Sequence, residues 1–122
     1  MALINRRLPD SELEVMQALW RCEIPATRKE IEAVLLPRHP MALTTLLTRL
    51  AEKGFLRIDK AGRGSVYTPL VTEQEYLAGQ SSRFFNKLCG GNLTTFASAL
   101  CDSGLSREEL DELKKLLEEH AL

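Results

Sequence analysis

The sequence lacks the features that mark membrane, secreted and metal-dependent proteins. It has no apolar run near the roughly 18 residues that a transmembrane helix needs, and its first ten residues, MALINRRLPD, lack the apolar stretch of a secretory signal. Three cysteines, Cys22, Cys89 and Cys101, are odd in number and widely spaced, which fits neither a disulfide framework nor a C-x-x-C metal site. We therefore expect a cytoplasmic protein without metal or cofactor, whose cysteines are reduced and structural.

Histidine is also scarce. His39 stands between prolines and His120 close to the C-terminus, and neither has a serine or cysteine at a spacing that suggests a nucleophile and its base. We expect no enzymatic activity.

Charge is balanced over the whole chain but not along it. Residues 1–70 hold 11 Lys and Arg against 8 Asp and Glu, whereas residues 71–122 hold 5 against 9. A basic first half and an acidic second half favour a module that faces nucleic acid, joined to a region with another role.

Capping residues and hydrophobic spacing predict three helices in the first half. The first begins at Asp10 or Ser11 and ends near Arg21, and the second begins at a T-x-x-E capping box, Thr27 with Glu30, and ends at the prolines of residues 36–40. The third covers residues 41–54, with Gly54 as its C-cap.

After residue 54 the spacing of the apolar residues changes from that of a helix to that of short strands. Residues 55–69 predict a hairpin with its turn at residues 61–64, and further capping boxes at residues 72–75 and 106–109 predict helices from 72 to about 88, from about 93 to 100, and from 106 onward. This order predicts a mainly α fold with a small β-hairpin: a winged helix-turn-helix in residues 1–71, followed by a helical dimerisation region in residues 72–122.

The third predicted helix carries little ordinary surface charge. Its leucines share one arc, and the rest of its surface presents Thr44, Thr45, Thr48 and Arg49. Short hydroxyl side chains and one long guanidinium suit close approach to base edges in a major groove. The alternative is a threonine-rich solvent face on an ordinary helix.

Two further basic positions add to this surface. Arg28 lies at the start of the second helix, where backbone amides also point outward, and Arg63 lies at the hairpin tip. Either arginine could equally be a solvated surface residue.

Four stretches resemble one protein family. ELEVMQALW (12–20), TRLAEKGFL (48–56), KAGRGSVYTPLVTEQEY (60–76) and GGNLTTFASAL (90–100) are similar to the penicillinase-repressor family of BlaI and MecI, with its copper-responsive CopY relatives. The resemblance implies a homodimeric transcriptional repressor that binds a palindromic operator. It places the recognition helix at Ala42 to Lys53, with alanine at 42 where relatives often have threonine, and it implies Thr44, Thr45, Thr48, Arg49 and the wing residue Arg63 as contacts. Together with Arg28 at the start of the second helix, the candidate DNA-binding residues are Arg28, Ala42, Thr44, Thr45, Thr48, Arg49, Lys53 and Arg63.

The last 50 or so residues are too few to bury their own apolar side chains, so we expect a second copy to cover them. The alternative is that they fold back onto the winged helix of the same chain. The candidate dimerisation residues are Phe84, Phe85, Leu88, Phe96, Leu100, Leu110, Leu113 and Leu117.

The resemblance also implies candidates for the signal that ends repression. In the β-lactam branch a membrane sensor metalloprotease cuts an Asn-Phe pair, which aligns with Ala99 and Leu100 here, and the copper branch carries C-x-C motifs that this chain lacks. Copper control is therefore disfavoured, and the substitution weighs against the protease route. The competing function is a winged-helix module that binds only protein.

Overall fold

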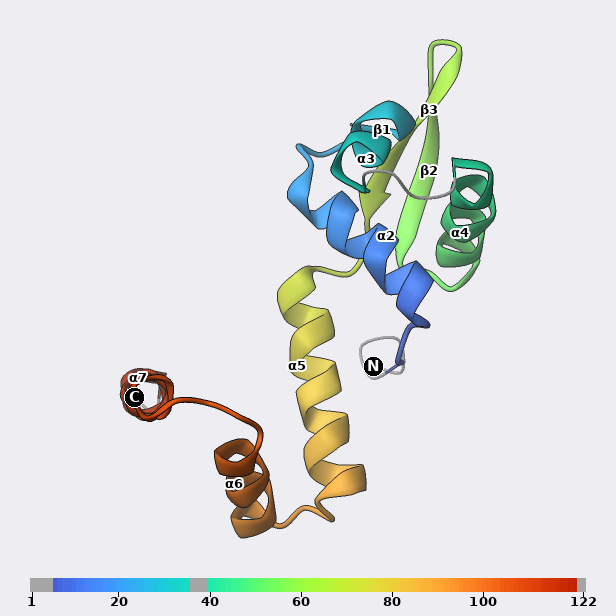
Figure 1. Cartoon of the computed structure of the whole chain (residues 1–122). Helices are drawn as coiled ribbons and strands as arrows, with labels where there is room; N and C mark the ends of the chain where they lie inside the picture. The colour runs from blue at the N-terminus through green and yellow to red at the C-terminus, as the bar shows by residue number, and fades with distance from the viewer. Residues whose placement is uncertain (1–5, 36–39, 121–122) are drawn as a thin grey trace. The chain divides into compact units, whose positions relative to one another are not determined.

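The computed structural model describes residues 6–35 and 40–120. The chain divides into two compact units between Ser82 and Arg83, and each is described by itself below (Figure 1). Residues 36–39, where prolines are predicted to end the second helix, lie outside the described residues, and so does His39.

The first unit is a winged helix-turn-helix, which confirms the predicted fold class. Antiparallel strands pair in the order β1-β3-β2, with Ala61 opposite Gly64 across a two-residue turn. The strand β1 was not predicted, because two residues are too short to show the alternation of a strand. In chain order the elements are α2 (Asp10–Arg21), β1 (Ala26–Thr27), α3 (Arg28–Leu35), α4 (Pro40–Glu52), β2 (Leu56–Ala61), β3 (Gly64–Pro69) and α5 (Glu73–Arg83).

Local capping chemistry sets most helix starts. In the first capping box, Thr27 N donates to Glu30 Oε1 at 2.9 Å and Glu30 N donates to Thr27 Oγ1 at 3.2 Å. The boxes at residues 72–75 and 106–109 form in the same way, and Gly54 ends α4 with φ +82°. The predicted side-chain cap of α2 is wrong: Pro9 occupies that position, makes no side-chain cap bond, and its carbonyl accepts from Leu13 N at 2.9 Å.

One hydrophobic core holds the first unit together, and it includes the start of α5. The Tyr76 hydroxyl accepts from Leu8 N at 3.0 Å, and Trp20 Nε1 donates to the Val71 carbonyl at 2.9 Å. The Tyr76 ring also lies 6.0 Å from those of Trp20 and Phe55. The compact unit therefore extends beyond residue 71 into α5, and the division of roles at residues 71 and 72 stays a prediction.

The second unit has little interior of its own. It consists of a π-helical turn, Phe84–Leu88, followed by α6 (Leu93–Asp102) and α7 (Arg107–His120). Phe96 packs edge-on against the rings of Phe84 and Phe85, at 5.8 and 5.5 Å. Among its described residues only Cys89 is buried.

The capping box at the start of α5 gives a testable stability effect. Hydrogen bonds from the backbone amide and the hydroxyl of Thr72 lower the pKa of Glu75 in the folded protein. Thr72→Ala should raise that pKa toward its ordinary value and lower the free energy of unfolding by about 1 kcal/mol at neutral pH. Chemical denaturation and a carboxyl NMR titration measure the two effects.

Thr72→Ser keeps the hydroxyl and serves as the matched control. Because the pKa of Glu75 is lower in the folded state, its contribution to stability is present at neutral pH and is lost as the pH falls through that lowered value. The difference between wild type and Thr72→Ala should therefore shrink in acid. An Ala variant as stable as the Ser variant at neutral pH would contradict the assignment.

Candidate DNA interface

Helix α4 is fixed on one side and open on the other. Leu43, Leu47 and Leu50 are at most 3% exposed in the core of the first unit. Leu46 and Ala51 are half-buried against the same core. The opposite side of the helix turns outward because leucines at this spacing fill a single arc. The exposed residues of α4 include Ala42, Thr44, Thr45, Thr48 and Arg49, with Glu52 in the last turn.

The hydroxyls on this face differ in what they bond. Thr48 Oγ1 donates to the Thr44 carbonyl at 2.9 Å, so its proton is used within the helix. Thr45 makes no side-chain hydrogen bond within the described part of the chain. Thr44 Oγ1 accepts a hydrogen bond from Arg28 Nη1 of α3.

Arg28 therefore joins α3 to the outward face of α4. Its Nε also donates to Glu32 Oε1 at 2.8 Å, and both side chains are about two-fifths exposed. Glu32 was not singled out from the sequence, although its i+4 spacing from Arg28 was a readable signal. At this helix start the Glu30 amide is already bonded to Thr27 Oγ1. Hydrogen bonds from the Thr27 backbone amide and hydroxyl to the Glu30 carboxylate lower the pKa of Glu30.

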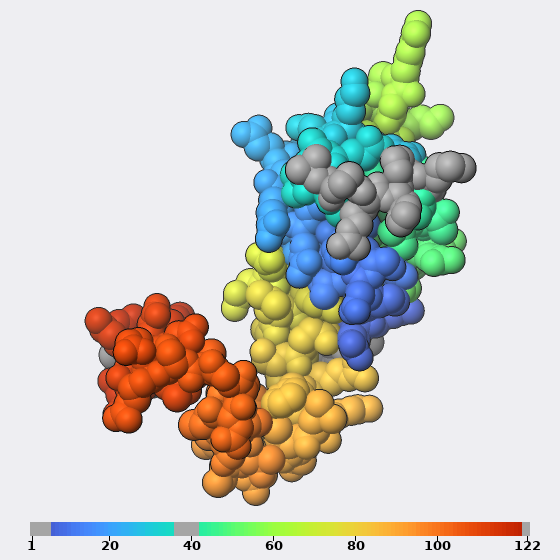
Figure 2. Space-filling model, viewed as in Figure 1, coloured from blue at the N-terminus to red at the C-terminus, as the bar shows by residue number. Residues whose placement is uncertain are grey.

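Two of the candidate arginines are exposed cations. Within residues 6–35 and 40–120, neither Arg49 nor Arg63 has an acidic partner, whereas Arg57 on β2 pairs with Asp59 at 2.7 Å. Arg63 follows Gly62, whose φ of +61° allows the tight turn. The tip that carries Arg63 projects from the surface of the first unit (Figure 2).

Lys53 lies in a different environment from the other candidates. Its ammonium pairs with Glu12 Oε1 of α2, and the two side chains are 20% and 5% exposed. The charge of Lys53 is therefore paired within the fold. Its partner Glu12 was not identified from the sequence.

The cysteines fall in three environments. Cys22 is half-buried and its thiol donates to the Ala18 carbonyl at 3.3 Å, and burial, aided by the negative charge of Glu30, raises its pKa. Cys89 is buried, as expected of a structural cysteine, but Cys101 is exposed on α6. None of the described helices is long and apolar enough to cross a membrane.

The architecture defines a winged helix-turn-helix protein. Its third helix, α4, presents exposed hydroxyl and guanidinium groups. Residues 8–119 match the penicillinase repressor family, and the chain belongs to that family. It is 36% identical over 117 residues to the penicillinase repressor of Bacillus licheniformis, covering 93% of this chain and 91% of that protein.

A further relative and a solved structure are similar to this chain. The methicillin resistance regulatory protein MecI of Staphylococcus aureus strain N315 is 28% identical over 113 residues, or 90% of this chain and 92% of its own. The solution structure of the DNA-binding domain of the repressor BlaI is 33% identical with a TM-score of 0.50, covering 59% of this chain and 90% of that one.

The ion pair of Lys53 with Glu12 gives a second test. Glu12→Leu leaves the ammonium largely buried without a partner, and we expect a loss of about 2 to 3 kcal/mol in the free energy of unfolding, since some water still reaches Lys53. The double variant Glu12→Leu with Lys53→Met should recover most of that loss, because no unpaired charge remains. Urea denaturation measures both.

The double variant also tests Lys53 as a DNA contact. If its ammonium neutralised a phosphate, its removal would lower the slope of log affinity against log salt by about 0.9. We expect an unchanged slope.

Proposed function

We propose that this member of the penicillinase repressor family, a DNA-binding transcriptional repressor, acts as a homodimer on a palindromic operator. Each copy lays α4 in the major groove, with Thr44, Thr45, Thr48 and Arg49 facing the bases and Arg63 of the wing reaching the backbone or the adjacent minor groove. Repression needs no chemistry, because the occupied operator blocks transcription.

The outward face of α4 is the observation that carries this proposal. A helix that reads a groove has to approach the bases closely, which small threonines allow and a row of long charged side chains prevents. The buried leucines of α4 hold that face at the surface of the first unit. Arg49 and Arg63 supply long cationic donors that have no acidic partner among the described residues.

The exposed apolar surface of the second unit supports dimerisation. Leu88 is 75% exposed and Leu117 is 61% exposed, so most of the surface of either side chain is left uncovered by the described residues. Leu110, Leu113 and Leu117 line one open apolar groove along α7. A second copy is the simplest cover, and a two-fold dimer would set two recognition helices about 34–36 Å apart, one turn of the duplex.

Release of the operator follows an unidentified signal or proteolysis. The candidate bond, Ala99–Leu100, lies within α6 and both residues are half-buried. A membrane sensor metalloprotease that took this bond as an extended strand would first have to unwind the helix, which the Asn92 cap holds through a 2.9 Å bond from Thr95 N.

A salt titration tests DNA binding and separates the two arginines. Arg49→Ala should weaken binding to the upstream region of the protein's own gene about 10-fold or more and relax base preference. Arg63→Ala should weaken binding to all duplexes alike and lower the salt slope by about 0.9. Fluorescence anisotropy with labelled duplexes at several salt concentrations measures both.

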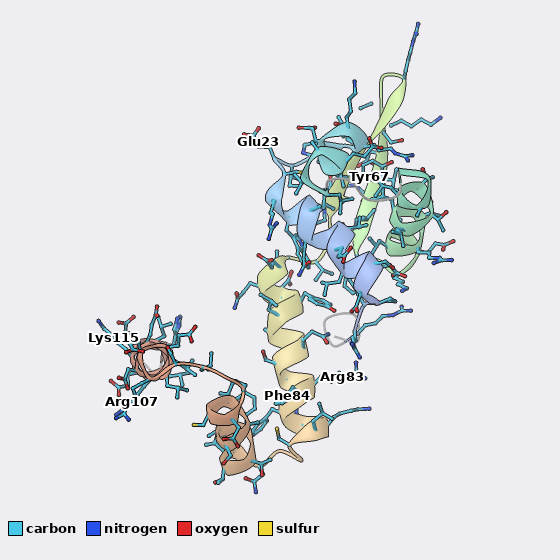
Figure 3. All side chains as sticks on the ribbon, in the orientation of Figure 1. Glu23, Tyr67, Arg83, Phe84, Arg107 and Lys115 are labelled. Atoms are coloured by element: carbon cyan, nitrogen blue, oxygen red, sulfur yellow. The ribbon has the colours of Figure 1, made fainter. Side chains whose placement is uncertain are left out.

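Arg107→Ala removes an equal charge from the exposed surface of α7 and is the matched control (Figure 3). It should bind like wild type. A wild-type protein that shows no sequence-selective, salt-sensitive binding would instead be an interaction module that binds only protein.

The dimer has its own test. Leu117→Glu places a carboxylate in the apolar groove of α7, and we expect a monomer in sedimentation at micromolar concentration, with affinity for a full operator reduced to that for a half-site. Lys115→Glu puts the same group on the opposite face of α7 and should remain dimeric. If Leu117→Glu stays dimeric, the α7 face is not the interface.

A further inference from the structure

We propose that Arg28 and Glu32 set the hydrogen-bonding direction of Thr44, so that Thr44 presents a proton donor to the base edge it meets. In this assignment Arg28 is a positioning residue that acts through Thr44 rather than a contact to DNA. The inference rests on the proposed function, since it concerns how the α4 face reads a duplex.

The argument begins with the chemistry of the guanidinium. Arginine has donors and no acceptor, so the contact between Arg28 Nη1 and Thr44 Oγ1 makes the hydroxyl oxygen the acceptor. The hydroxyl proton must then point elsewhere. No group among the described residues receives it, because Thr44 makes no other side-chain bond there. Within the described residues the proton is therefore left without an acceptor, and a base edge can accept it.

Glu32 fixes the arginine that imposes this direction. The 2.8 Å bond from Arg28 Nε to Glu32 Oε1 ties the guanidinium along α3 and partly offsets its charge. An arginine held in this way is less free to swing toward a phosphate than one without a carboxylate partner. The pair lies within α3, and the contact of Arg28 with Thr44 joins it to α4, so Thr44 is held relative to α3.

The hydroxyl of Thr48, one turn further along α4, has the opposite hydrogen-bonding direction. Its proton is given to the Thr44 carbonyl, which leaves oxygen lone pairs and a methyl group facing outward. Two chemically identical side chains therefore present different patterns: a donor at Thr44, and an acceptor with a methyl at Thr48.

A donor at Thr44 selects among bases. In the major groove, guanine, adenine and thymine each offer an acceptor, whereas the exposed polar group of cytosine is an amino donor. Thr44 should therefore disfavour cytosine at the one position it faces. A single neutral hydrogen bond of this kind gives a discrimination of about 3- to 10-fold.

The test compares binding to operators in which each position is changed to every base. Thr44→Val, which is nearly isosteric, should lose discrimination against cytosine at one position by about 3- to 10-fold. Arg28→Lys and Glu32→Gln should lose it at that same position, because lysine cannot bridge both partners and glutamine holds the guanidinium weakly. The double variant Arg28→Lys with Thr44→Val should lose no more than either single variant.

Salt dependence separates positioning from contact. Arg28→Ala should leave the salt slope unchanged, whereas an arginine that neutralises a phosphate would lower it by about 0.9. Glu32→Gln should raise affinity for an unrelated duplex, since it removes a negative charge from the surface facing DNA, while its base discrimination falls. A variant that was merely misfolded would lose affinity for both duplexes.

The outcomes distinguish this inference from the function beneath it. If wild type binds no duplex selectively, the proposed function fails. If wild type is selective, and Arg28→Ala lowers the salt slope with every base preference intact, the positioning role is overturned and Arg28 is a phosphate contact. If Thr44→Val keeps every base preference, Thr44 does not read a base.

Discussion

The burial of three leucines on one side of α4 is the constraint on which the interface depends. Leu43, Leu47 and Leu50 pack in the same core as Met16, Leu19 and Phe55, so the helix can neither rotate nor withdraw without opening a cavity in a small domain. This packing fixes the positions of the residues on the outward side of α4. The reading residues can therefore be small and individually weak, because the scaffold supplies the precision.

The acids of the first unit complement this arrangement. Glu32 restrains Arg28, Glu12 pairs with Lys53 inside the fold, and Asp59 pairs with Arg57 beside the wing. The exposed cations without such partners in the described ranges include those on the face of α4 and at the hairpin tip. Arg49 and Arg63 thus remain without an acidic partner within the described residues, at positions where the proposed function needs positive charge, even though the whole chain has a net charge of −1.

Local chemistry made much of this fold readable from the sequence. The capping boxes, the glycine after α4 and the leucine arc depend on residues within one or two turns of each other, and each was predicted. The strand β1, the ion pair of Lys53 with Glu12 and the contact of Arg28 with Thr44 depend on residues brought together from different elements, which periodicity does not encode. For the same reason the exposed face of α4 could be predicted, but the direction of each hydroxyl could not.

The single tryptophan of the chain packs against the start of α5 within the first unit. Trp20 donates to the Val71 carbonyl, and its ring stands 6.0 Å from that of Tyr76, which is buried at the start of α5. The fluorescence of Trp20 therefore reports whether the start of α5 stays packed against the core of the first unit. A red shift of its emission on addition of an inducing compound would show, without any added label, that the start of α5 has separated from Trp20.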